Sequence, residues 1–210
     1  MVLMMLAKLS NFISERVQMV KVTFYYRFFF KDFGKGSKII KPIKVSCRSA
    51  RIGHNVYIAH HARIEEIKTH HNQKFEPNII IDDNVTIEQR LHIVACNLVK
   101  IGKHSCISYD VMITDVDHSY KEINKAIQLQ PLITHSTIIG ERCFIGAGVK
   151  INAGTTLGEQ CIVGANSVVR GKFPDYSVIV GAPARIIKRY CFEMNEWRKT
   201  DKYGQFIDEN

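Results

Sequence analysis

The sequence lacks an apolar run long enough to cross a membrane as a helix. Such a helix needs about 18 or more predominantly apolar residues, and the N-terminal apolar stretch is interrupted by Lys8, Glu15, Arg16 and Lys21. A cleavable signal peptide is also a poor match, because no small-residue cleavage site follows the short apolar segment before Lys8. The chain is therefore expected to be cytoplasmic.

A disulfide framework is absent as well. The six cysteines are scattered and form no Cys-x-x-Cys pair, which is typical of reduced thiols in a cytosolic compartment. Two of them, Cys143 and Cys161, occupy positions where small core residues belong, so we interpret them as core residues rather than nucleophiles. We expect no disulfide bridges.

Acidic residues are scarce in the first part of the chain. Met1 to Arg48 holds ten Lys and Arg against two acidic residues, whereas the remainder carries 19 against 18. This basic segment has no DNA- or RNA-binding signature, and charge alone is equally compatible with a lipid, a nucleotide or an acidic partner. We therefore expect no nucleic acid partner.

An amphipathic pattern covers the N-terminus. Apolar residues recur at steps of three and four, which is typical of a helix with one apolar face, at Val2, Leu6, Leu9, Ile13, Val17 and Val20. The aromatic stretch "VTFYYRFFFKDF" follows. Residues 1–48 therefore form a basic extension that either packs on the protein or a neighbouring subunit, or makes peripheral contact with the inner face of an anionic membrane.

From Ile52 onward the sequence is repetitive. Hexapeptides such as "IGHNVY", "IGAGVK" and "VGANSV" each begin with an aliphatic residue, often followed by Gly, Asn or Asp. A period of six does not match a helix but suits a short strand and a tight corner, and three such strands would close a coil of about 18 residues. The sequence predicts an all-β parallel β-helix of about five coils over residues 51–181.

The period is interrupted between Thr114 and Thr137. A long excursion from a coil belongs at a surface corner, and loops of this kind often carry function. This one begins with "ITDVDHSYKEINK", in which His118 is flanked by carboxylates. Residues 114–137 are therefore the candidate catalytic loop.

The repeat, the loop and the tail together resemble the hexapeptide-repeat acyltransferases, in particular the maltose/galactoside and polysaccharide O-acetyltransferase branch. The most specific parts are "IGERCFIGAGVKINAGTTLGEQCIVGANSVV" and "YSVIVGAPARIIKR". The resemblance covers about Arg51 to Arg189 and implies a left-handed coil and a homotrimer with active sites between subunits. We also expect a short helix in the C-terminal tail, residues 182–210.

The resemblance implies that His118 is the catalytic residue. A neutral imidazole can accept a proton from a sugar hydroxyl near neutral pH. Family members often show Asp-His-x-His here, and Val116 stands at the first histidine position. Further candidates for orienting His118 or binding the acceptor are Asp115, Asp117, Tyr120 and His92. Solvation of the loop is an alternative role for the two aspartates.

Acetyl-CoA is the implied donor. The resemblance places Phe144, Ala147 and Ala165 beside the pantetheine arm, with Phe144 standing where the family commonly has Trp. Cations suit the anionic nucleotide end, and the candidates are Arg170, Lys172, Arg185 and Lys188. No histidines lie at the five-residue spacing of the zinc ligands in related carbonic anhydrases, so no metal is expected.

The resemblance therefore implies an acetyl-CoA-dependent O-acetyltransferase that acts on a sugar hydroxyl of a surface polysaccharide, lipopolysaccharide or capsule precursor. A free sugar or an amino sugar is an alternative acceptor. A non-catalytic hexapeptide-repeat scaffold is an alternative from a different functional class.

Overall fold

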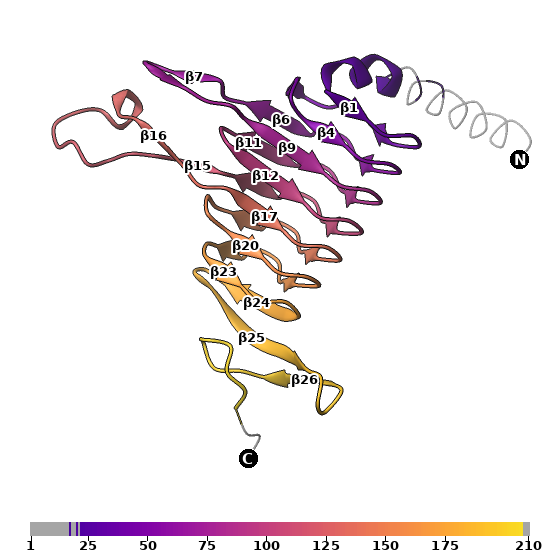
Figure 1. Cartoon of the computed structure of the whole chain (residues 1–210), viewed down its shortest axis with the longest axis vertical. Coiled ribbons are helices and arrows are strands. Elements are labelled where there is room, and N and C mark those ends of the chain that lie inside the picture. The colour runs from indigo at the N-terminus through magenta and orange to yellow at the C-terminus, as the bar shows by residue number, and fades with distance from the viewer. Residues whose placement is uncertain (1–16, 18–19, 21, 208–210) are drawn as a thin grey trace, which may run out of the picture.

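The strands wind into a coil whose walls are three parallel sheets. The computed structural model describes residues 17, 20 and 22–207. Strands that follow one another along the chain enter the three sheets in turn, so each coil contributes one strand to each sheet. Figure 1 shows these coils stacked along the long axis of the molecule. The predicted all-β, parallel β-helical architecture is confirmed.

The three sheets have the following strands, in spatial order. The first sheet contains β1 (Asp32–Phe33), β4 (Arg51–Ile52), β9 (Asn78–Ile81), β12 (Leu98–Ile101), β17 (Thr137–Ile139), β20 (Thr156–Leu157) and β23 (Lys172–Phe173). The second contains β2 (Lys38–Ile39), β5 (Tyr57–Ile58), β10 (Thr86–Ile87), β13 (Cys106–Ile107), β18 (Phe144–Ile145), β21 (Ile162–Val163), β24 (Ser177–Gly181), β25 (Ala184–Cys191) and β26 (Glu196–Lys199). The third contains β22 (Val168–Val169), β19 (Lys150–Ile151), β14 (Met112–Thr114), β11 (His92–Ala95), β6 (Arg63–Glu66) and β3 (Lys44–Ser46).

Aliphatic residues at the six-residue step fill the interior of the coil. Ile139, Ile145 and Ile151 are completely buried. The parallel register pairs Ile101 with Ile139 and Ile139 with Leu157, so equivalent side chains stack from one coil to the next. Burial of each aliphatic side chain stabilises the fold by about 1.5 to 3 kcal/mol relative to its exposure to water. Cys143 and Cys161 lie in the same core, which confirms their interpretation as core residues.

Close approach between coils explains the small residues at the corners. A Cβ atom added to Gly140 would lie 2.3 Å from the carbonyl oxygen of Gly158 in the next coil. At other corners the backbone adopts the left-handed conformation, for example at Asn84 and Asn166. Asn adopts this conformation more readily than most residues, which explains its place in the repeat.

The coil begins before the predicted boundary at Arg51. Strands β1, β2 and β3 pair in parallel with β4, β5 and β6, respectively. The estimate of about five coils therefore omitted a first coil within the predicted N-terminal extension. The stretch "DFGKGSKIIKPIKVS" keeps the six-residue apolar step at Phe33, Ile39 and Val45, so the signal for this coil was present in the sequence.

The aromatic stretch near the N-terminus divides into two parts. Phe30 belongs to the core, and Tyr26 and Phe29 pack against it, whereas Phe24 and Phe28 are 60% and 69% exposed. Residues 22–26 are helical and lead into a 3-10 turn, Arg27–Phe29. Most of the predicted amphipathic helix lies outside the described residues, so membrane contact stays a prediction. No helix in the described part of the chain is long and apolar enough to span a membrane.

The predicted C-terminal helix is wrong. The tail instead forms β25 and β26, which extend the second sheet with antiparallel pairing. Within "ARIIKRYC" the side chains of Ala184 and Ile186 are buried while Arg185 and Ile187 are exposed. This alternation is the period of a strand. The open edge of β24 provides the pairing partner for β25.

Candidate active site

The interrupted repeat forms an arm that projects from the coil (Figure 1). After β14 the chain leaves the third sheet and forms the antiparallel pair β15 (Val116–His118) and β16 (Leu132–Thr134). A short 3-10 turn, Ile127–Leu129, lies between them, and the chain rejoins the first sheet at β17. His118 is the last residue of β15, opposite Leu132, and its side chain is exposed. His118, the candidate general base, therefore lies on the arm within a few residues of the coil.

Asp115 anchors the beginning of the arm. Its side chain is completely buried, and its carboxylate oxygens accept hydrogen bonds from the backbone N–H groups of Cys96 and Asn97 at 2.8 and 2.6 Å. Burial raises the pKa of the Asp115 carboxyl, although these backbone hydrogen bonds oppose the increase. Asp115 therefore holds the arm to the preceding coil and is inaccessible to an acceptor, so the prediction that it binds one is wrong.

Asp117 pairs with one of the predicted phosphate-binding cations. Two nitrogens of the Arg170 guanidinium donate to the two Asp117 carboxylate oxygens at 2.8 and 2.9 Å. A bidentate pair of this kind fixes both side chains geometrically. Asp117 immediately precedes His118, so the ion pair links the start of the arm to the coil that carries Arg170.

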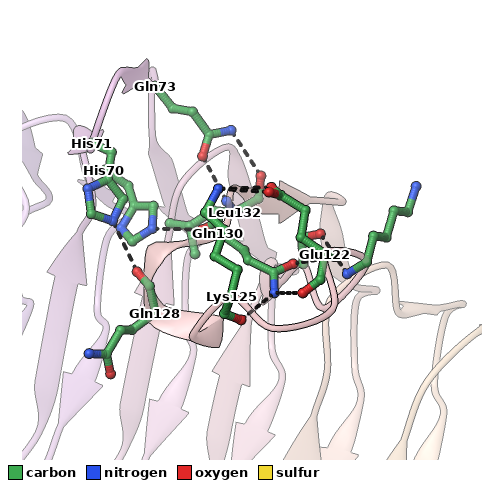
Figure 2. Close-up of polar contacts among 10 residues, drawn as sticks. His70, His71, Gln73, Glu122, Lys125, Gln128, Gln130 and Leu132 are labelled. Atoms are coloured by element: carbon green, nitrogen blue, oxygen red, sulfur yellow. Dashed lines mark hydrogen bonds and ion pairs between the residues drawn. The ribbon is translucent and has the colours of Figure 1, made fainter.

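Gln130 holds the two sides of the arm together. Its side chain is completely buried. Its amide nitrogen donates to the carbonyl oxygens of Glu122 and Lys125, and its amide oxygen accepts from the N–H of Glu122. The distal part of the arm is therefore a structured loop, as Figure 2 shows.

A second excursion, which the sequence analysis missed, docks on this arm. Strands β7 (Thr69–His70) and β8 (Gln73–Lys74) form a small antiparallel hairpin. Its side chains bond backbone groups of the arm (Figure 2): His70 and His71 donate to carbonyl oxygens, and Gln73 both donates to and accepts from Leu132. The loss of the six-residue step between Ile64 and Ile81 was the available signal.

The hairpin also brings a second imidazole to the candidate base. The ring centroids of His70 and His118 are 5.9 Å apart, with the ring planes 79° to each other. The two residues are 48 positions apart in the sequence, and no local pattern connects them. Tyr120, two residues beyond His118, is 77% exposed and is accessible to a ligand.

Three of the four predicted phosphate-binding cations line one cavity. It has a volume of about 450 Å³ and is lined by Arg170, Lys172 and Arg185, together with Lys202 and Tyr203. Among the described residues, neither Lys172 nor Arg185 forms an ion pair with an acidic side chain. Lys188 is exposed on β25, opposite Val178 and Lys199, and is not part of this lining.

The residues predicted beside the pantetheine arm lie on neighbouring coils. Phe144 is 49% exposed and is paired with Ile162 on the next coil. The corner after each of these strands carries Ala147 or Ala165, and the N–H of Asn166 donates to the carbonyl oxygen of Ala147. The three residues therefore follow one edge of the coil.

His92 lies in a separate cavity of about 300 Å³, which is also lined by Arg63, Met112 and Lys150. Its Nε2 atom is buried without a hydrogen-bond partner. Burial and then the positive charge of Arg63 lower the pKa of the His92 imidazole. His118 does not line this cavity, so the two candidate histidines do not share it. No group of three or more potential metal ligands occurs among the described residues.

Residues 136–171 match the family described as bacterial transferase hexapeptide (six repeats). Over these residues the chain is similar to the hexapeptide-repeat transferases. It is 38% identical over 128 residues to WbbJ of Escherichia coli (strain K12), which is named, provisionally, a lipopolysaccharide biosynthesis O-acetyl transferase. That match covers 58% of this chain and 65% of WbbJ, just under two thirds of the relative's length.

Solved structures of this hexapeptide-repeat fold include two that match most of the chain. A point mutant of AntD, an N-acyltransferase from Bacillus cereus in complex with dTDP-4-amino-4,6-dideoxyglucose and coenzyme A, has a TM-score of 0.62 at 18% identity, covering 81% of this chain and 89% of AntD. A galactoside acetyltransferase in complex with coenzyme A has a TM-score of 0.53 at 19% identity, covering 90% and 86%. At these identities the likeness establishes the fold.

Proposed function

We propose that this protein is an acetyl-CoA-dependent O-acetyltransferase that acts on a sugar hydroxyl of a surface polysaccharide, lipopolysaccharide or capsule precursor. The observation that carries the proposal is the exposed imidazole of His118, held near the base of a projecting arm in a hexapeptide-repeat coil. The name of the relative WbbJ supports both the reaction class and the type of acceptor.

His118 would act as a general base. Its neutral imidazole accepts the proton of the acceptor hydroxyl while that oxygen attacks the thioester carbonyl. The carbon–sulfur bond then breaks, and the proton passes from the imidazolium to the departing thiolate of coenzyme A. No covalent enzyme intermediate is required. The buried Cys143 and Cys161 are not placed to form one.

The cationic cavity suits the phosphates of the donor. Lys172 and Arg185 are exposed cations without acidic partners among the described residues, so they are free to make charge-assisted hydrogen bonds to phosphate oxygens. Arg170 is already paired with Asp117 and would have to be shared or exchanged. We therefore assign the main phosphate contacts to Lys172 and Arg185, with Lys202 beside them.

Reversing the charges at these two positions should weaken donor binding. The double variant Lys172→Glu/Arg185→Glu is expected to raise the Kd for acetyl-CoA at least about tenfold, since each charge-assisted contact contributes about 1.5 to 3 kcal/mol. Titration calorimetry would measure the change. Lys103→Glu, at an exposed corner outside the cavity, is the matched control and should bind normally. An unchanged Kd in the double variant would contradict the assignment.

Acetyl transfer itself is tested by incubating the protein with acetyl-CoA and a panel of hydroxyl and amino sugars. Release of the coenzyme A thiol should accelerate with a hydroxyl sugar, and mass spectrometry should find the acetylated product. Acceleration by amino sugars alone would assign N-acyl transfer instead. Failure to bind acetyl-CoA or to release thiol with any acceptor would support the non-catalytic scaffold.

We also propose that the protein is a homotrimer whose active sites lie between subunits. The outer surface of the second sheet supports this, because apolar side chains follow one another across successive strands at Cys106, Phe144, Ile162 and Val178. A cyclic trimer forms through heterologous contacts between two different patches of each subunit, and this apolar strip would be one of them. Mass photometry should give about three times the chain mass of 24.0 kDa. A stable, active monomer would contradict the shared site.

A further inference from the structure

The hairpin Thr69–Lys74 meets the arm at three residues. The Nε2–H of His70 donates to the carbonyl oxygen of Gln130 at 3.1 Å, and the Nε2–H of His71 donates to that of Gln128 at 3.0 Å. Gln73 accepts from the N–H of Leu132 at 2.7 Å and donates to its carbonyl oxygen at 3.1 Å. Figure 2 shows these contacts between two segments that both lie outside the repeat.

Gln73 occupies the free edge of the strand that faces the candidate base. Leu132 is the cross-strand partner of His118. In an antiparallel ladder, a residue whose N–H and C=O point away from its partner leaves both groups unpaired at the edge. Both groups of Leu132 bond the Gln73 amide. The hairpin therefore fixes the strand opposite His118 without adding a strand of its own.

The ring of His70 is in contact with the ring of His118. A carbonyl oxygen can only accept, so the hydrogen bond to Gln130 requires a proton on Nε2 of His70 and sets the tilt of its ring. The ring meets His118 edge to face, at a centroid distance of 5.9 Å. This is a common geometry for interacting aromatic rings. His71 makes a similar hydrogen bond to the arm, and no ring contact between His71 and His118 occurs in the described structure.

We propose that His70 is a positioning residue for the candidate base: its ring, fixed by the Gln130 carbonyl, holds the His118 imidazole in the orientation needed for proton transfer. The inference rests on the proposed function of His118. An exposed side chain at the end of a strand otherwise samples several rotamers. The contact with His70, which lies on the hairpin and not on the arm, restricts the rotamers available to His118.

The sharpest test uses matched substitutions at adjacent histidines. His70→Gln keeps an N–H donor for Gln130 but removes the ring, and His71→Gln makes the same change beside it. His70→Gln should lower kcat by about 10- to 100-fold with little change in the KM for acetyl-CoA, because small displacements of a catalytic group have effects of this size. His71→Gln should keep nearly the wild-type kcat. A wild-type kcat in His70→Gln would overturn the proposal.

A measurement without turnover separates this inference from the enzymatic proposal. The imidazole proton resonances of His118, assigned by comparison with His118→Asn, should shift in His70→Gln and stay in place in His71→Gln. Backbone amide exchange at Leu132 should be unchanged in both variants, since Gln73 still bonds it. Unshifted His118 resonances in His70→Gln would overturn the positioning role even in an active enzyme. If the His118 resonances shift in His70→Gln but the wild-type protein acetylates no acceptor, the contact between His70 and His118 is supported and the proposed acetyltransferase function is not.

Discussion

Turnover should fall by about 10²- to 10⁴-fold in His118→Ala, the usual effect of removing a positioned general base. Affinity for acetyl-CoA should be nearly unchanged, because His118 lies on the arm and does not line the cationic cavity assigned to the phosphates. Steady-state kinetics with the acceptor identified from the sugar panel would measure the first effect, and calorimetry would measure the second.

His118→Asn is the stricter variant, because the amide keeps hydrogen bonding but cannot accept the acceptor's proton. His104→Asn is its matched control: His104 is exposed at a corner with a φ of 59°, a conformation that Asn tolerates well. More than a tenth of wild-type turnover in His118→Ala would assign the base to another group.

The coil was predictable because its determinants are local. A single period of six sets which side chains point inward, and a reader of the sequence can follow it from Ile139 to Val169 without knowing any contact. Its loss also located the arm that carries His118. The same argument, applied between Ile64 and Ile81, would have located the hairpin of His70.

Other features depend on contacts between distant parts of the chain. Strand β25 forms on the edge of β24, a pairing that the sequence of the tail does not reveal, and a helix was predicted there instead. Arg170 was assigned to phosphate from its charge, yet its nearest partner is Asp117, 53 positions away. Such pairings exist only once the coils are stacked.

Asp115 shows how far the role of a charged side chain depends on burial. In sequence it is one of two carboxylates before His118, equally suited to solvent or substrate. In the structure it is completely buried and supplies acceptors for two backbone N–H groups of another coil. Asp117, two residues later, is exposed enough to pair with an arginine. Asp115 lies where the arm leaves the coil and is buried there, whereas Asp117 lies on the arm itself and is partly exposed.

Asp115→Ala should therefore lower the free energy of unfolding by about 1 to 3 kcal/mol, because the buried N–H group of Cys96 and the N–H group of the more exposed Asn97 lose their acceptors. Asp115→Asn keeps one of the two acceptor oxygens, so its free energy of unfolding should fall by less. Burial raises the pKa of the Asp115 carboxyl in the folded protein. The folded state therefore binds the carboxyl proton more tightly than the unfolded state does. As the pH rises through the acid range in which the carboxyl ionises, the wild type should consequently lose stability relative to Asp115→Asn.

Denaturant unfolding at several pH values would measure both stability effects, and hydrogen exchange would locate them. The amides of Cys96 and Asn97 should exchange faster in Asp115→Ala, while those of distant core strands such as β21 change little. The arm begins at this residue, so His118 should also lose its fixed position and turnover should fall in parallel. A stability loss below about 0.5 kcal/mol, within the range of ordinary surface substitutions, together with unchanged exchange at Cys96 and Asn97, would show that the arm is held to the coil by Asp117 and Arg170 instead.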